Sequence, residues 1–298
     1  MPHMFIFGLG YTASRLAVAL RERGWSVDAT GRQGNCRFDD RKQVSDALAR
    51  ATHILSSVPP DRSTGADPVL QNYGAELSGQ VREGLWLGYL SSTGVYGDQG
   101  GAWVDEATPV DPGRSPRATA DAAWLKQRAS VFRLPGIYGP GRSALDRVRE
   151  GTMRRIDLPS QVFSRVHVDD IVAAILAALE TDAPPGPYNI ADDLPTSANL
   201  PVEEACRLLG RAAPPLQTLE EANLTPMARG FYAENRRVAN GKAKRILGWR
   251  PRYPTFVEAL RAILAASGTA TGTERALSAT TMPSKASTPP AIASGDQR

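Results

Sequence analysis

Short apolar runs alternate with segments of helical periodicity at the start of the chain. The runs Met4–Phe7, Trp25–Thr30 and Thr52–Val58 each predict a buried β-strand, because they are brief and are followed by glycine or proline. Between them, Thr12–Arg23 and Arg41–Ala51 have the residue pattern of helices, which in Thr12–Arg23 sets apolar residues three or four positions apart. Strands that alternate with helices in this way form a parallel sheet with helices on both faces.

The same alternation continues to about residue 266, and the composition then changes. Ser267–Arg298 is rich in small and polar residues, which predicts a disordered tail. We therefore predict an α/β fold with a Rossmann-type doubly wound parallel sheet, mainly over residues 1–185, and a small C-terminal substrate lobe, mainly over residues 186–266. The later predicted strands are Leu85–Ser91, Ser130–Leu134 and Tyr188–Ala191, and the later predicted helices are Ala118–Ala129, Asp169–Glu180, Val202–Leu209, Gly241–Leu247 and Pro254–Ala266.

Composition and charge narrow the class of protein. Apolar residues make up 42% of the 298 residues, and the net charge of +4 is scattered, without a basic run that would indicate nucleic-acid binding. Cys36 and Cys206 lie in no metal-ligand or redox motif. No apolar run approaches the roughly 20 residues that span a bilayer, and the start lacks the basic region of a signal peptide. We expect a soluble, cytoplasmic protein with no metal site.

A glycine-rich turn follows the first predicted strand. Gly8, Gly10 and Ala13 form a G-x-G-x-x-A fingerprint between a strand and a helix, the context in which this motif binds a dinucleotide. Gly8 permits a tight turn, Gly10 lets the backbone approach a pyrophosphate, and Ala13 keeps helix and strand close. The helix N-terminus then faces the anion.

The end of the second predicted strand indicates which dinucleotide is bound. NAD sites usually have an acidic residue there, which binds the ribose 2′-hydroxyl. Here Gly31 takes that position and Arg32 follows, a pair that favours the 2′-phosphate of NADP(H). In the alternative, Arg32 is solvated, Asp28 binds the ribose and NAD is the cofactor. Asp39 is a candidate for the adenine edge, or else a helix N-terminal carboxylate.

Three further segments resemble the extended short-chain dehydrogenase/reductase family, the nucleotide-sugar epimerase and dehydratase type. Ser91–Gly97 resembles its SS-x-x-VYG segment, Leu134–Gly141 its LRPxxxYGPG segment, and Val166–Asp170 its HVDD segment. The later stretches Arg236–Asn240 and Leu247–Trp249 resemble the atypical, YeeZ-like subgroup. The resemblance covers residues 3–265 and implies a Rossmann fold, an NAD(P) cofactor, a small-molecule substrate and, by analogy, a homodimer.

The resemblance assigns roles position by position. Ser92 is the implied catalytic hydroxyl, which hydrogen-bonds the substrate oxygen. The implied substrate residues are Thr93, Arg142 and His167; for His167 the alternative is a structural hydrogen bond at a strand end. The implied cofactor-binding residues, together with Arg32 and Asp39, are Gly8, Gly10, Tyr11 and Thr12 at the pyrophosphate, Ser57, Val58 and Pro59 beside the nicotinamide ribose, and Pro135 and Ile137 near the carboxamide.

The chain departs from the family pattern at two places. Phe7 stands where the family has its first glycine. Arg117 and Asp121 stand where the family has a catalytic Tyr and, four residues later, a Lys. That spacing puts both side chains on one helix face, where the Tyr transfers a proton as hydride moves and the Lys lowers its pKa. Arg117 cannot act as an acid or base near neutral pH. We expect Arg117 and Asp121 to form a structural ion pair.

Residues that lie close to these motifs in sequence are candidates for a replacement acid: Tyr96, Tyr138, Asp98, Asp105 and Glu106. The sequence does not choose among them. Its first interpretation is an NADP(H)-preferring epimerase- or reductase-like enzyme that acts on a small polar substrate. The alternatives are a non-catalytic NADP(H)-binding sensor or regulatory protein, and a scaffold that has lost the cofactor. Arg236 and Arg237 are either contacts for an anionic substrate or a solvated basic pair.

Overall fold

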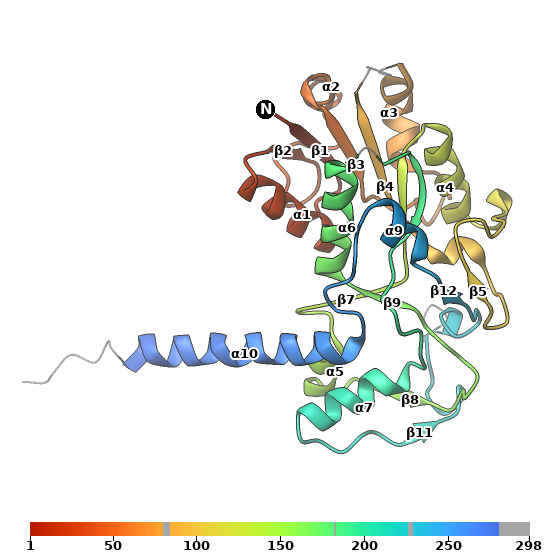
Figure 1. Cartoon of the computed structure of the whole chain (residues 1–298), viewed down its shortest axis with the longest axis vertical. Helices are drawn as coiled ribbons and strands as arrows, with labels where there is room; N and C mark the ends of the chain where they lie inside the picture. Colours follow the sequence, from red (N-terminus) through yellow and green to blue (C-terminus); the bar gives the residue numbers. More distant parts are fainter. Residues whose placement is uncertain (80–83, 182, 226–228, 280–298) are drawn as a thin grey trace, which may run out of the picture.

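A six-stranded parallel sheet forms the core of the upper part of the molecule (Figure 1). The computed structural model describes residues 1–79, 84–181, 183–225 and 229–279. The strand order is β10-β6-β4-β3-β1-β2, and every neighbouring pair is parallel. This confirms the predicted Rossmann-type sheet. The strands are β1 (His3–Phe7), β2 (Ser26–Ala29), β3 (His53–Ser56), β4 (Trp86–Ser92), β6 (Ser130–Leu134) and β10 (Gly186–Asn189).

Helices cover both faces of the sheet. Helices α1 (Tyr11–Glu22) and α6 (Val168–Glu180) bury Leu16 and Ile171 in one apolar cluster. On the other face, α2 (Arg41–Arg50), α3 (Pro68–Gly79) and α4 (Pro116–Lys126) bury a second cluster that contains Val44, Tyr73 and Trp124. Of these helices, only α3 has no counterpart in the sequence-based prediction.

The chain order creates a switch point at β1. From β1 the chain crosses to β2 on one side and then to β3 on the other, and β1 pairs with both. In sheets of this kind, ligands bind outside the carboxyl ends of the strands at such a point. Beyond β2, the only strand-like pairing in the described residues is one parallel bridge between Thr30 and Cys36. The connection from β2 to α2 is therefore a loop.

The carboxyl ends of the strands point towards a smaller lobe (Figure 1). Its core joins Leu145, Cys206 and Leu260. Its elements are β7 (Gly136–Tyr138) paired with β9 (Arg165–His167), β8 (Arg155–Ile156) paired with β11 (Leu216–Gln217), α5 (Ala144–Arg149), α7 (Asn199–Leu208) and α10 (Phe256–Ala279). Above the lobe lie the short 3₁₀ helices η1 (Thr93–Tyr96) and η2 (Pro112–Arg114), β5 (Trp103–Val104) paired with β12 (Arg237–Val238), and α9 (Gly241–Ile246).

Two features of the lobe bear on the predicted division of the chain. The lobe core joins α5 to α7 and α10, so it draws on residues on both sides of position 185. Helix α10 continues to Ala279, beyond the predicted helix end at Ala266. It thus extends into the segment predicted as disordered, because adding a residue to a formed helix costs less free energy than starting a helix. Residues 280–298 of the predicted tail lie outside the described residues. Among the helices described, none combines the length and apolarity of a membrane span.

Candidate functional site

The ends of β1 and β3 bring together the first group of predicted cofactor residues. Gly8 has a φ of +85°, and a Cβ there would lie 2.9 Å from Val58 Cγ2, so the turn requires glycine. The Ser57 hydroxyl donates a hydrogen bond to the Gly8 carbonyl oxygen, and Pro59 follows in an exposed position. The structure therefore places Gly8, Ser57, Val58 and Pro59 at the switch point.

The N-terminus of α1 is open to an anion. Gly10 caps the helix without a side-chain hydrogen bond, and the first turn has no acidic residue. A Cβ on Gly10 would meet no atom of the described residues within 4 Å, so the backbone at Gly10 is open to a close approach. Helix-end amides attract phosphate through their N–H groups and the helix dipole. Thr12 is buried, so its contribution here is its backbone amide.

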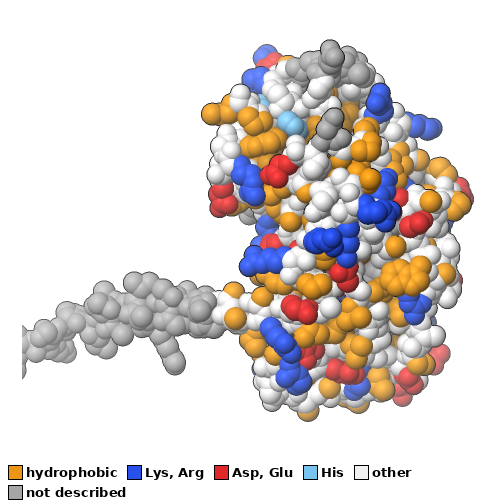
Figure 2. All heavy atoms as spheres, viewed as in Figure 1, with side chains coloured by type: hydrophobic (Ala, Val, Ile, Leu, Met, Phe, Trp, Pro, Cys, Tyr) orange, Lys and Arg blue, Asp and Glu red, His pale blue; other side chains and the backbone are white. Residues whose placement is uncertain are grey.

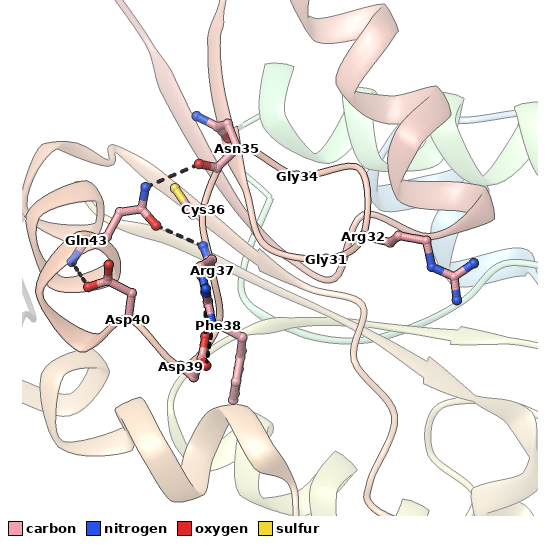
Figure 3. A pocket seen from close by; sticks show the side chains of 10 residues that line it. All are labelled: Gly31, Arg32, Gly34, Asn35, Cys36, Arg37, Phe38, Asp39, Asp40 and Gln43. Carbon is pink, nitrogen blue, oxygen red and sulfur yellow. Dashed lines mark hydrogen bonds and ion pairs between the residues drawn. The ribbon is translucent and has the colours of Figure 1, made fainter.

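The loop between β2 and α2 lines a shallow, open pocket of about 650 Å³, the loop cavity (Figure 3). Arg32, Arg37 and Asp39 supply its charged lining together with Asp40, and Phe38 supplies an aromatic ring. Figure 3 shows Arg32 pointing away from Arg37 and Asp39, on the far side of the Gly31–Gly34 turn. The lining suits a polar ligand with a ring.

The acidic residues around this loop have distinct roles. The Asp28 carboxylate accepts from Asn35 Nδ2 at 2.7 Å, lies 3.0 Å from His3 Nε2 and forms an ion pair with Arg50, so it is already engaged within the protein. Asp40 caps α2 by accepting a hydrogen bond from the Gln43 amide at 3.0 Å. Asp39 forms a two-bond ion pair with exposed Arg37. Asp39 therefore lies at the N-terminus of α2, directly before the capping residue Asp40, but its carboxylate contacts Arg37.

Ser92 ends β4 and begins the 3₁₀ turn η1. Its Oγ accepts a hydrogen bond from the Gly94 amide at 3.1 Å, which leaves the hydroxyl proton available to another acceptor. Ser92 is partly exposed, whereas Thr93 is buried with 4% of its surface exposed.

Two arginines and a glutamate lie over this turn. Arg114 donates to the Gly94 carbonyl oxygen at 2.9 Å, and Arg236 donates to the Gly97 carbonyl oxygen at 2.7 Å. Glu234 forms an ion pair with each of them. Arg236 Nη2 and Ser92 Oγ both lie within 4.0 Å of the point where a Gly94 Cβ would be. In Figure 2, basic side chains gather across the middle of the visible face, between the sheet and the lobe.

Arg237 is the other member of the predicted basic pair. Its guanidinium donates to the Gly101 carbonyl oxygen, so it joins β12 to the segment before β5. Arg237 is thus a structural residue here, whereas Arg236 presents one guanidinium nitrogen beside Ser92.

The segments after β6 and β9 meet at α1. The ring of His167 is buried and caps α6, with Nδ1 accepting from the Asp169 amide at 3.2 Å. Burial lowers the pKa of His167, which keeps the ring neutral near pH 7. The Nδ1 atom of His167 therefore makes a structural hydrogen bond at the end of β9, as the alternative to a substrate contact expected. Pro135 and Ile137 are partly exposed at this edge, and Arg142 lies 5.0 Å from the centre of the Tyr11 ring.

No family model matches the chain. By sequence, the chain is 30% identical to the 3-diazoavenalumate denitrifying reductase of a Streptomyces species, over 84% of this chain and 96% of that protein. It is 27% identical to Protein YeeZ of Escherichia coli K12, over 85% of this chain and 97% of that protein. The chain belongs to the atypical short-chain dehydrogenase/reductase family, in its YeeZ-like subgroup.

Solved structures agree with this family. A conserved protein of unknown function from Silicibacter pomeroyi is 38% identical, with a TM-score of 0.80 over 89% of this chain and 99% of that chain. Human epimerase family protein SDR39U1 with NADPH is 17% identical, with a TM-score of 0.66 over 87% and 98%. The Bacillus anthracis dTDP-glucose 4,6-dehydratase in complex with NAD is 18% identical, with a TM-score of 0.66 over 89% and 96%. The last two show the fold.

Asp121, at the position of the Lys in this dehydrogenase/reductase family, is part of a buried network. Asp121 is 1% exposed and binds Arg133 through two hydrogen bonds of 2.7 and 3.1 Å. Ser91, next to Ser92, donates to Asp121 at 2.6 Å. Arg117 instead donates to the Tyr89 hydroxyl at 3.0 Å. The expected Arg117–Asp121 ion pair is therefore wrong, because Arg133 on β6 reaches the carboxylate from the sheet.

The residues considered as replacement acids mostly serve the structure. Tyr96 donates to Asn189 Oδ1 at 2.8 Å and accepts from Arg133 at 3.0 Å. The Tyr138 oxygen is buried, and that burial raises the pKa of Tyr138, so it is not a ready acid.

The three carboxylates are engaged in the same way. Asp98 accepts from the Asn235 amide at 2.8 Å, and Asp105 accepts from amides in its own turn. Glu106 accepts from the Asn189 amide at 2.7 Å. Each carboxylate thus holds a backbone segment in place.

Sequence reasoning missed Arg114, Glu234 and Arg133. Arg114 ends the short 3₁₀ helix η2 and Glu234 lies in a loop, neither within a motif, and they meet across 120 residues of sequence. Arg133 lies inside an otherwise apolar strand, and this is the one signal that was available: a charge in a buried strand requires a buried partner.

Proposed function

We propose that this protein is an NADP(H)-preferring oxidoreductase that acts on a small polar substrate, with Ser92 as its active-site hydroxyl. The observation that carries the proposal is the backbone at Gly31. Its φ is +118°, and a Cβ there would lie 2.9 Å from the Leu9 nitrogen. An acidic ribose ligand therefore does not fit at this position, and exposed Arg32 follows it.

The proposed site runs along the switch point. The adenosine and its 2′-phosphate would occupy the loop cavity near Arg32, where a guanidinium can bind a phosphate through two hydrogen bonds. The pyrophosphate would lie at the α1 N-terminus, and the nicotinamide ribose beside Ser57 and Val58. The structural neighbours SDR39U1 and the dehydratase, with NADPH and NAD in their respective structures, support a nicotinamide dinucleotide.

The substrate would lie against Ser92. A bound NADPH would supply hydride to the substrate carbon. The Ser92 hydroxyl is free to donate to the substrate oxygen, because its acceptor side is taken by Gly94. Arg236 adds positive charge on the same side of the turn, which stabilises negative charge that grows on that oxygen. The proton would then come from water.

One relative suggests a hydride acceptor whose reduction needs no proton from the protein. The name of the Streptomyces relative indicates a diazo compound as its substrate. An aryl diazonium ion that receives a hydride gives the arene and dinitrogen, and needs no proton from the protein. We infer that diazo compounds are a substrate class to test here beside carbonyl compounds.

A second candidate function is a non-catalytic NADP(H) sensor. The structural roles of Tyr96, Asp98, Asp105 and Glu106 favour it, since each of these groups is engaged in hydrogen bonds elsewhere.

The Ser92→Ala variant separates the two functions. An enzyme loses NADPH oxidation about 10- to 1000-fold while its NADPH affinity holds. Tight NADPH binding without oxidation by any aldehyde, ketone or diazo acceptor would favour the sensor.

The cofactor preference has its own test. Arg32→Asp should weaken NADPH binding, measured by fluorescence titration, by at least about tenfold and should leave NADH binding nearly unchanged. A preference that stays the same in this variant would contradict the assignment of Arg32 to the 2′-phosphate.

A further inference from the structure

A loop from the lobe side contacts the glycine-rich turn. Tyr11, the first residue of α1, donates its hydroxyl proton to the Pro140 carbonyl oxygen at 3.0 Å, across 129 positions of sequence. A Cβ on Gly139 would lie 2.6 Å from Tyr11 Oη, so this close approach depends on glycine. The guanidinium of Arg142 lies 5.0 Å from the Tyr11 ring centre. The residues 139–142 thus form one wall beside the α1 N-terminus.

Two arginines lie against Tyr11, and they differ in their partners. Arg15 lies 5.2 Å from the ring centre and pairs with Asp169 at 3.2 Å. For Arg142, which is exposed, the described part of the chain offers no carboxylate within ion-pair distance. An exposed guanidinium without a carboxylate partner is available to bind an anionic ligand.

A buried donor at the same junction also lacks an acceptor. His167 is 2% exposed, and its Nδ1 accepts from Asp169, so the ring hydrogen is on Nε2. Among the described residues, Nε2 has no hydrogen-bond partner, and it lies 3.4 Å from the Gly139 Cβ point, which Tyr11 Oη also approaches. The junction therefore has one buried donor without an acceptor, on a ring that is independent of the α1 N-terminus.

We propose that Arg142 binds the cofactor pyrophosphate from the lobe side, opposite the amides of α1. The proposal rests on the proposed dinucleotide site and reassigns Arg142, which the family resemblance places in the substrate cleft. A guanidinium matches two phosphate oxygens through paired hydrogen bonds. Through Tyr11 and Pro140, cofactor binding then fixes the loop that leads into the lobe.

The test compares ligands with and without a pyrophosphate. NADPH and NADH contain one, whereas adenosine 2′-monophosphate has the 2′-phosphate but no phosphate at the 5′ position. Fluorescence titration of the full chain should show that Arg142→Gln weakens NADPH and NADH equally, by about tenfold. The monophosphate, measured by calorimetry, should keep its affinity within about twofold, and Arg142→Lys should recover part of the NADPH and NADH loss.

Matched variants control for charge and position. Arg15→Gln removes a guanidinium from the same ring but leaves the proposed contact, so its NADPH affinity should stay within about twofold of wild type. Arg32→Gln should weaken NADPH and the monophosphate but not NADH. Equal weakening of the monophosphate by Arg142→Gln, or unchanged NADPH affinity in that variant, overturns the role of Arg142. Absence of NADPH and NADH binding by the wild type overturns the proposed function itself.

Discussion

Two arginine–aspartate pairs with the same forked geometry lie at opposite ends of the candidate site. Arg37 and Asp39 meet beside the loop cavity with bonds of 3.3 and 3.0 Å, and both side chains are more than 70% exposed. Arg133 and Asp121 meet under the Ser92 turn with bonds of 3.1 and 2.7 Å, and both are nearly fully buried. The two pairs share the same charged groups, but the buried pair is shielded from solvent and also bonds Ser91 and Tyr96.

The difference in solvent exposure distinguishes the loop cavity, where a ligand can bind, from the buried contacts under the Ser92 turn, which hold the structure. Water screens the exposed pair and competes for its hydrogen bonds, so Arg37 can exchange its partner for a ligand. The buried pair has no such freedom, because removal of one partner leaves a charge in the core. The position that carries the Lys in related enzymes thus anchors β4 to β6 here, through Ser91, Asp121 and Arg133.

The largest effect is expected at the buried pair. Asp121→Ala should lower the free energy of unfolding by about 3–5 kcal/mol, because it leaves Arg133 buried without its partner. Urea denaturation followed by circular dichroism measures the change. Asp121→Lys, which restores the residue type of the family, should be at least as damaging. A loss below about 1 kcal/mol for Asp121→Ala would show that Tyr96 alone satisfies Arg133.

Asp192 is a buried carboxylate with no cationic hydrogen-bond partner among the described residues. In contrast to Asp121, its replacement should stabilise the protein. Burial raises the pKa of Asp192 from 3.8 to about 7. The folded state therefore holds a proton that the unfolded state releases, and stability should fall as pH rises from about 4 to 7 and level off above. Asp192→Asn should remove this slope and stabilise the protein at pH 8 by up to about 4 kcal/mol.

Thermal denaturation at pH 4.5 and pH 8 checks this prediction. The matched control is Asp193→Asn, whose carboxylate pairs with Lys244 at 2.5 Å near the surface. A wild type with equal stability at both pH values would show that Arg165 keeps Asp192 ionised after all.

Local patterns sufficed for the sheet and the glycine-rich turn. Strand and helix periodicity is written in consecutive residues, and Gly8 and Gly10 act through their own backbone. The partner of Asp121 was not predictable in this way. On one helix, Arg117 is four residues away and looks suitable, but the tertiary fold brings Arg133 closer and gives Arg117 to Tyr89. Contacts between distant segments, such as that of Tyr11 with Pro140, leave no local pattern.

In the loop between β2 and α2, the backbone at Gly31 should also be sensitive to substitution. Gly31→Asp introduces the carboxylate of an NAD site but places a side chain at φ +118° against the Leu9 nitrogen. We expect a loss of NADPH affinity of at least about tenfold with no gain for NADH, because the glycine-rich turn must move. Fluorescence titration measures both. A clean switch to NADH without loss of thermal stability would show that the turn adapts.

The smallest effect is expected at the exposed pair. Asp39→Ala should leave the midpoint of urea unfolding unchanged, because water replaces the carboxylate at Arg37. It should tighten NADPH binding by about two- to threefold at low salt, since one negative charge leaves the cavity that the 2′-phosphate is proposed to enter. Asp46→Ala removes an equally simple exposed pair, with Lys42, away from the cavity and should change neither quantity. A stability loss at Asp39 like that at Asp121 would mean that geometry, and not burial, decides what an arginine–aspartate pair contributes.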